Sequence, residues 1–165
     1  MRFAVARIDD ETGGPLVAAL LADLIARYGV EDPDEPAPDD LAPPRGTFLV
    51  AFAGDEHDDA VGCGGLRHHE GDTAELKRMY VDPRARRRGI ARALLDELER
   101  RAARLGYARI VLETGVRQPE AIALYTSAGY APIESYGYYG RSPLSRCFEK
   151  ELAEAVGPEG AQGTS

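Results

Sequence analysis

The sequence predicts a single mixed α/β domain, and three observations lead to this fold class. Runs rich in β-branched and aromatic residues alternate with runs whose apolar residues recur at helical spacing. Their order along the chain is strand, helix, three strands, helix, strand, helix and two strands. The 165 residues suit one domain with a sizeable core. We expect this domain to span residues 1–153, followed by a disordered tail at 154–165.

The chain begins with an expected strand at residues 3–8, followed by a helix. Gly13-Gly14-Pro15 opens this helix and Gly29 ends it. Residues 31–44 are rich in Asp, Glu and Pro, with Leu41 as the one large apolar residue, so we expect an exposed loop there. A solvated acidic linker is the favoured role for this loop, and a lid over a cationic substrate is the alternative.

Two β-rich runs, at residues 47–53 and 60–66, flank a turn-forming segment and indicate a hairpin. The pair Gly64-Gly65 predicts a close approach of another backbone, or a bulge. His68 and His69 come next, and we expect them in a loop. Adjacent residues of a strand point to opposite faces, so even there the pair would ligate one metal poorly, and no metal site is expected.

The second half of the chain supplies the remaining expected elements. A loop that contains Tyr136, Tyr138 and Tyr139 precedes the last strand. The same signals of periodicity, proline starts and glycine stops predict strands at residues 73–81, 107–114, 130–133 and 146–152, and helices at residues 90–105 and 119–128.

An arginine-rich turn between the strand at 73–81 and the long helix is the most informative stretch of the chain. Four arginines, at positions 84, 86, 87 and 88, precede the helix directly. The N-terminus of a helix is positively polarised and its first N–H groups lack partners, so cations are unfavourable there. A bound polyanion would offset this arrangement, and Gly89, which has no Cβ, would let backbone amides approach phosphate oxygens. The alternative is a solvated arginine cluster.

The charge balance indicates which kinds of ligand the protein is expected to bind. The net charge is −8, from 20 Lys and Arg against 28 Asp and Glu, although the region around the arginine turn is basic. One basic spot on an acidic protein favours a small anionic ligand over nucleic acid. No apolar run has the length of a membrane span, and the N-terminal residues do not form a signal peptide. We therefore expect a cytoplasmic protein without a membrane partner, in which Cys63 and Cys147 are reduced.

Three blocks in this chain resemble the GCN5-related N-acetyltransferases, a superfamily that transfers an acetyl group from acetyl-CoA to an amine. Residues 76–83 resemble the central strand of that family. Residues 86–91 resemble its pyrophosphate loop, written (Arg/Gln)-x-x-Gly-x-(Gly/Ala). Residues 118–125, followed by Gly129-Tyr130, resemble its Asn-x-x-Ala-x-x-x-Tyr segment. The resemblance implies a mostly antiparallel sheet of six to seven strands, flanked by helices and splayed to admit acetyl-CoA as co-substrate.

The resemblance also assigns roles. The backbones of Met79 and Val81 would pair with pantetheine. Tyr125 would give a proton to the departing thiolate, although the sequence alone equally permits a core aromatic. Gln118, which stands where the family commonly has asparagine, would contact the cofactor. The residues that would surround the pyrophosphate are Arg86, Arg87, Arg88, Gly89, Ile90 and Ala91.

The general base and the acceptor are less sharply indicated. Glu75 is slightly preferred as the base, with Glu113 or a water chain as alternatives, and either carboxylate also suits a cross-strand ion pair. The tyrosine-rich loop would border a pocket for an amine of a small molecule or peptide. A homodimer is possible, as in other family members. A non-catalytic acyl-CoA-binding module is the alternative function, and a nucleic-acid binder conflicts with the acidic remainder of the chain.

Overall fold

The protein contains one large sheet and three α-helices within the residues that the structure, a computed structural model, describes: 1–30, 34–54, 59–137 and 142–153. The helices are α1 (Gly13–Tyr28), α2 (Ile90–Arg104) and α3 (Pro119–Ser127), and two short 3₁₀ helices are η1 (Pro38–Leu41) and η2 (Pro83–Ala85). The strands are β1 (Arg2–Val5), β2 (Thr47–Phe52), β3 (Ala60–Glu70), β4 (Thr73–Val81), β5 (Arg109–Gly115), β6 (Ala131–Ile133) and β7 (Ser145–Glu151).

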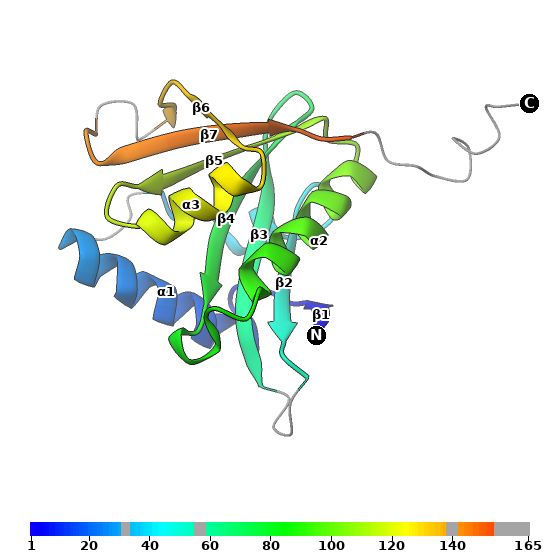
Figure 1. Cartoon of the computed structure of the whole chain (residues 1–165). Coiled ribbons are helices and arrows are strands. Elements are labelled where there is room, and N and C mark those ends of the chain that lie inside the picture. Colours follow the sequence, from blue (N-terminus) through cyan, green and yellow to red (C-terminus); the bar gives the residue numbers. More distant parts are fainter. Residues whose placement is uncertain (31–33, 55–58, 138–141, 154–165) are drawn as a thin grey trace, which may run out of the picture.

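The seven strands lie in the order β1-β2-β3-β4-β5-β7-β6 (Figure 1). Neighbouring strands are antiparallel, except that β4 and β5 are parallel and are connected through η2 and α2. The expected mixed, mostly antiparallel sheet with flanking helices is therefore confirmed. No helix in the described parts of the chain is long and apolar enough to cross a membrane.

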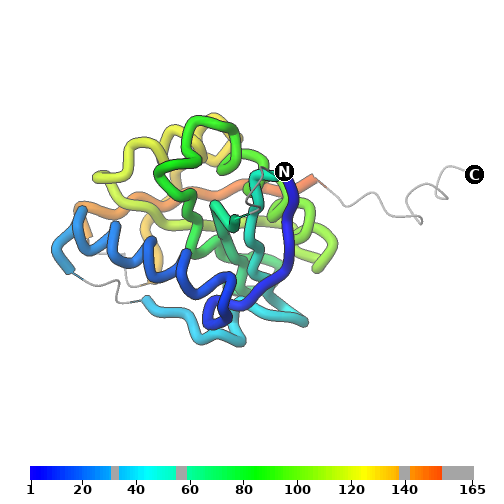
Figure 2. The backbone as a smooth tube through the Cα atoms, turned by 90° about the horizontal axis from the view of Figure 1, so that it is seen from below, coloured from blue at the N-terminus to red at the C-terminus, as the bar shows by residue number. Residues whose placement is uncertain are grey.

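Helices cover both faces of the sheet, and alternation along β2 shows how the sequence divides them. Phe48 and Val50 pack with Leu16 of α1 and Leu41 of η1. Leu49, between them, packs on the opposite face with α2 and with Tyr125 of α3. Figure 2 shows α1 on one side of the sheet and α2 and α3 on the other.

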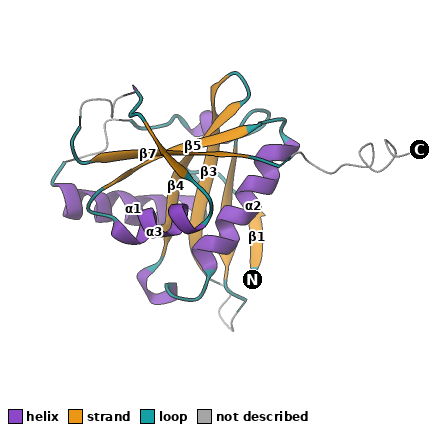
Figure 3. Ribbon diagram, turned by 45° about the horizontal axis from the view of Figure 1, so that its top comes forward, coloured by secondary structure: helices purple, strands orange, loops and turns teal. Residues whose placement is uncertain are grey.

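The sheet splays between β4 and β5. The two strands pair only from Thr73–Leu76 to Arg109–Leu112, although β4 continues to Val81 and β5 to Gly115 (Figure 3). Just beyond the paired segment Arg78 has φ of 62°, which is unusual for a residue with a Cβ and marks a kink in β4. The alternation changes there: Leu76 packs toward α2, and so does Met79, three residues later.

Gly64 of β3 leaves room for the side chain of Met79, the residue that follows the kink. A Cβ at position 64 would lie 2.5 Å from Sδ of Met79 and 2.8 Å from Cδ1 of Leu98. The register between β3 and β4 also shifts between Cys63 and Gly65. The irregularity lies opposite the glycine pair, but the extra residue belongs to β4 and not to the pair itself, and the groups that approach Gly64 are two side chains and not a backbone.

Two sequence-based element boundaries were wrong. The first strand ends at Val5 and not at residue 8, because Asp10 accepts hydrogen bonds from the backbone N–H groups of Arg7, Thr12 and Gly13 and turns the chain into α1. Strand β3 extends to Glu70, so His68 and His69 lie in a strand and not in a loop. Its end pairs with the start of β4 across a tight turn at Gly71-Asp72.

The expectation of an exposed loop at residues 31–44 was also only partly correct. Residues 31–33 lie outside the described parts of the chain. Pro38–Leu41 forms η1, and Leu41 is 1% exposed in the core beneath α1. Asp34 is not a solvated linker residue, because its carboxylate forms ion pairs with Arg67 and Lys77 on the sheet.

Candidate active site

A cavity of about 500 Å³ opens where β4 leaves β5. Met79, Tyr80 and Val81 line it from β4, and Tyr125 from α3. The arginine turn and the start of α2 close one end with Arg86, Arg87, Gly89, Ile90, Ala91 and Arg92. The end of β4 and the arginine turn, which follow each other in the sequence, thus meet α3, which comes about thirty residues later, and all three segments were singled out by the sequence motifs.

The backbone of the arginine turn has the shape of an anion cradle. Arg87 and Gly89 both have positive φ, 63° and 77°, and α2 begins directly after them. No side chain caps this helix start and no acidic residue lies in its first turn. A Cβ at Gly89 would meet nothing within 4 Å, so the glycine serves the backbone conformation and leaves the space in front of it open. Such a helix start favours phosphate groups.

The four arginines of the turn do not act alike. Arg86, Arg87 and the unpredicted Arg92 line the cavity, whereas Arg84 and Arg88 do not. Arg84 instead forms an exposed pair with Asp82 at 3.0 Å. The Arg86 guanidinium lies over the ring of Tyr80 and donates from Nε to the carbonyl oxygen of Val81 at 3.0 Å, which fixes its stem beside the cavity.

Two carboxylates line the α1 side of the cavity, against four arginines in the whole lining, and both carboxylates pair with Arg27. Arg27 of α1 pairs with Asp23 at 3.0 Å and with Glu120 of α3 at 2.6 Å. Burial works against the charge of Arg27, but the hydrogen bond that Arg27 donates to Glu120 and the charge of Asp23 outweigh it and raise the pKa of the guanidinium. The cavity therefore keeps a positive balance at its arginine end, which suits an anionic ligand.

Tyr125 lies in the wall of the cavity and is 6% exposed. Its ring packs edge-on against Tyr130, with 5.7 Å between centroids. Burial, followed by the negative charge of Glu113, raises the pKa of the Tyr125 phenol well above its usual value. The hydroxyl is therefore protonated at neutral pH and has a proton to donate.

Gln118 also lines the cavity, at the start of α3. Its side-chain oxygen accepts hydrogen bonds from the Tyr28 hydroxyl at 3.1 Å and from the Gly115 N–H at 3.3 Å. The side chain thus ties the end of α1 to the end of β5, a role that the sequence did not indicate.

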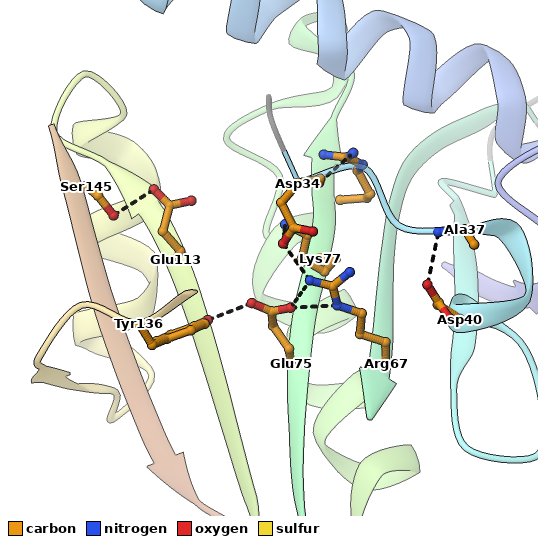
Figure 4. Close-up of polar contacts among 10 residues, drawn as sticks. Asp34, Ala37, Asp40, Arg67, Glu75, Lys77, Glu113, Tyr136 and Ser145 are labelled. Carbon is orange, nitrogen blue, oxygen red and sulfur yellow. Dashed lines mark hydrogen bonds and ion pairs between the residues drawn. The ribbon is translucent and has the colours of Figure 1, made fainter. Parts of the chain in front are cut away.

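The two candidate bases lie on neighbouring strands, Glu75 at the end of the paired segment of β4 and Glu113 on β5 just beyond it (Figure 4). Glu75 is 1% exposed; its Oε1 accepts from Arg67 at 2.7 Å and its Oε2 from the Tyr136 hydroxyl at 2.8 Å. Glu113 on β5 is half-buried and accepts from the Ser145 hydroxyl at 3.1 Å. Tyr136 thus joins its loop to Glu75 across the splay; Tyr138 and Tyr139 fall outside the described residues.

The structure brings most of the sequence-predicted site residues together around one cavity. Met79, Val81, Gln118 and Tyr125 line it with the arginine turn, whereas neither Glu75 nor Glu113 does. The sequence did not indicate Leu20, Asp23 and Arg27, which recur at helical spacing on one face of α1. That spacing was visible in the sequence, but nothing in it showed that this face of α1 would meet α3.

Comparison with known proteins agrees with this geometry. The model of the acetyltransferase (GNAT) family matches residues 17–130. An IAA acetyltransferase of Azospirillum brasilense is 43% identical over 113 residues, which cover 68% of this chain and 72% of that protein. An uncharacterised N-acetyltransferase of Bacillus subtilis is 30% identical over 148 residues, covering 88% of this chain and 98% of that one.

Solved structures share the fold. A candidate acyl-CoA N-acyltransferase from Klebsiella pneumoniae has a TM-score of 0.76 at 30% identity, covering 92% of this chain and 97% of that one. A GNAT family acetyltransferase from Elizabethkingia anophelis, solved with acetyl-CoA bound, has a TM-score of 0.65 at 17% identity, with coverages of 92% and 97%. With its splayed sheet, arginine cradle and matching family model, this chain belongs to the GNAT acetyltransferase family.

Proposed function

We propose that the protein transfers the acetyl group of acetyl-CoA to a primary amine of a small molecule or peptide. The observation that carries this proposal is the single cavity that joins the arginine cradle, the diverging edge of β4 and the Tyr125 phenol. Acetyl-CoA, bound there, would supply an activated thioester. The cradle offers N–H groups and arginines to its phosphates, and β4 beyond Leu76 offers backbone groups to its pantetheine arm.

The residues around the splay then divide the proton transfers. The amine attacks the thioester carbonyl directly, forming a C–N bond as the C–S bond breaks. Tyr125, protonated and buried at the cavity wall, gives its proton to the departing thiolate. Among the two carboxylates, we assign the amine proton to Glu113. Both oxygens of Glu75 already accept hydrogen bonds from Arg67 and Tyr136.

Within this proposal Glu75 is a positioning residue, which holds Arg67 and the Tyr136 loop at the splay. The sequence-based preference for Glu75 as the base is the untested alternative to this assignment. A cytoplasmic location, a homodimer and a single domain at residues 1–153 also stay predictions. The alternative function, an acyl-CoA sensor, requires the cavity but no proton donor.

Replacement of Tyr125 by Phe separates the two functions. We expect Tyr125→Phe to lower kcat by about 10²–10⁴-fold, because general acid catalysis is lost, while the affinity for acetyl-CoA changes little. The measurement is release of free thiol from acetyl-CoA with a panel of primary amines. Tyr130→Phe is the matched control, since Tyr130 packs against Tyr125 but donates its hydroxyl to Glu99. Acetyl-CoA binding without thiol release on any amine, in the unmodified protein, would support the sensor.

A further inference from the structure

A charged cluster of five side chains lies beside the splay: Asp34, Arg67, Glu75, Lys77 and Arg78 (Figure 4). Glu75 and Lys77 alternate along β4 with Ala74 and Leu76, which pack toward α2, so the cluster lies on the face away from α2. Lys77 and Arg78 directly follow Leu76, the last residue of β4 that pairs with β5. The cluster therefore borders the same opening as the proposed cofactor strand, from the other face.

Three cations in this cluster converge on one carboxylate-bearing residue that does not belong to the sheet. Oδ2 of Asp34 is 2.5 Å from Nη2 of Arg67 and 3.2 Å from Nζ of Lys77. The Arg78 guanidinium reaches the backbone carbonyl oxygen of Asp34 at 3.4 Å. Asp34 lies between α1 and η1, so the sheet contributes the cations and a separate segment contributes the anion.

Burial makes this anion necessary. Lys77 and Arg78 are 8% and 7% exposed, and a buried cation without a counter-charge is costly. Although burial alone would raise the pKa of the Asp34 carboxyl, the hydrogen bond from Arg67 and the charge of Lys77 lower it below its usual value. Glu75, the other carboxylate, is already engaged by Arg67 and Tyr136. The position of the Asp34 carboxylate is thus a built anion site in an otherwise acidic protein.

We propose that the charged cluster binds the carboxylate of the acceptor, and that the protein acetylates amino acids or similar carboxylated amines. In the absence of substrate the Asp34 carboxylate occupies this position, and the carboxylate of the acceptor displaces it on binding. Arg67 and Lys77 then hold the acceptor through charge-assisted hydrogen bonds, with its amine directed toward the splay. This inference rests on the proposed function. A polyamine acceptor is disfavoured, because it would place further positive charge beside Arg67, Lys77 and Arg78.

The test compares α-amino acids with their α-carboxamides as acceptors in the thiol-release assay. We expect kcat/KM for the acids to exceed that for the matched amides by at least about tenfold, mainly through KM. Lys77→Met is expected to lower this acid-to-amide ratio by at least about tenfold. Lys150→Met is the matched control, since Lys77 and Lys150 are the only lysines in the sequence and Lys150 also forms an ion pair, with Glu99 at 2.8 Å.

A second variant, Asp34→Asn, removes the charge of the internal competitor while keeping the side-chain shape. The inference predicts a lower KM for the acids, whereas a purely structural pair predicts an unchanged or higher one. Thermal unfolding shows whether each variant folds, and the comparison of KM for Asp34→Asn still tests the inference if Lys77→Met does not fold.

Calorimetric titration of each variant with acetyl-CoA separates the two levels of the proposal. If the protein binds acetyl-CoA but acetylates amides and acids equally efficiently, or acetylates no amino acid, the carboxylate subsite is wrong and the cofactor site is unaffected. Absence of acetyl-CoA binding overturns both.

Discussion

Glu75 and Glu113 lie on the neighbouring strands β4 and β5, close to where the two strands separate, and their partners differ. Glu75 pairs with the Arg67 guanidinium and accepts a hydrogen bond from the Tyr136 hydroxyl, so its charge holds two neighbouring segments in place. Glu113 is half-buried beside Ser145, and its charge acts on Tyr125, the proposed acid. In the proposed reaction Glu113 is the base and Tyr125 the acid, so the two proton transfers would fall to residues that interact electrostatically.

Glu113→Gln is therefore expected to lower kcat/KM for the amine by about 100-fold or more at neutral pH. The deficit should shrink as pH rises, because a larger fraction of the amine is then unprotonated without help from the enzyme. The measurement is a pH profile of kcat/KM. Glu75→Gln is expected to raise the KM for the acceptor and lower the melting temperature. If the acidic limb of the pH profile disappears in Glu75→Gln and persists in Glu113→Gln, then Glu75 and not Glu113 is the general base.

At the scale of elements, strand β4 determines the shape of the candidate active site. Its first half pairs with β5, and its second half diverges after the kink at Arg78 and lines the cavity. The sequence predicted the arginine turn and the helix after it, because the signals for both are local: a proline, a glycine and a helical stripe. It did not predict the kink, since arginine has no preference for positive φ and Gly64, which accommodates it, is far away in sequence.

The ion pairs of Asp34 illustrate the same limit. A run of Asp, Glu and Pro is ordinarily solvated, and only the tertiary structure brings Asp34 to Arg67 and Lys77, more than thirty residues further along the chain. The cavity residues on α1 were missed for a related reason, since contact between α1 and α3 is not encoded by either helix alone. The family motifs predicted most of the residues that line the cavity from β4, the arginine turn and α3, but neither the α1 residues of its lining nor the ion pairs of Asp34, which form through such long-range contacts.

The start of α1 offers a sharp test at this scale, because it contains two adjacent glycines with different surroundings. A Cβ at Gly13 would collide with the carbonyl oxygen of Arg7 and lie 2.8 Å from the Phe48 ring, whereas one at Gly14 would have 3.7 Å of room. Gly13→Ala is expected to reduce the free energy of unfolding by about 1–3 kcal/mol or more. Gly14→Ala should change it by less than about 1 kcal/mol. Urea unfolding measures both, and equal effects would contradict the packing described for this helix start.

At the scale of the molecule, the larger core cluster joins α2 and α3 to the sheet and contains two tyrosines that face each other, Tyr125 and Tyr130. Burial raises the pKa of both phenols above the usual value of 10.0, and so do the nearby carboxylates, Glu113 for Tyr125 and Glu99 for Tyr130. In the folded protein they stay protonated at a pH where the unfolded chain loses their protons.

Stability should therefore fall as pH rises above about 10, because unfolding then releases protons. The slope contributed by each such tyrosine approaches about 1.4 kcal/mol per pH unit. Tyr130→Phe should flatten this fall, and urea unfolding between pH 8 and pH 11 measures it. Equal slopes for the variant and the unmodified protein would show that the Tyr130 hydroxyl ionises as readily in the folded protein as in the unfolded chain.

The central claim, that the turn before α2 holds the phosphates of acetyl-CoA, is tested most directly by one calorimetric titration on a pair of variants. Gly89 and Gly106 lie just before and just after α2, with φ of 77° and 95°, and a Cβ at either would meet nothing within 4 Å. Glutamate therefore imposes similar backbone strain at both positions, but it places a negative charge in the cradle only at position 89. We predict that the unmodified protein and Gly106→Glu bind acetyl-CoA with similar affinity and that Gly89→Glu binds at least about 100-fold more weakly. Equal binding by the two variants would contradict the phosphate site, and with it the account of this cavity.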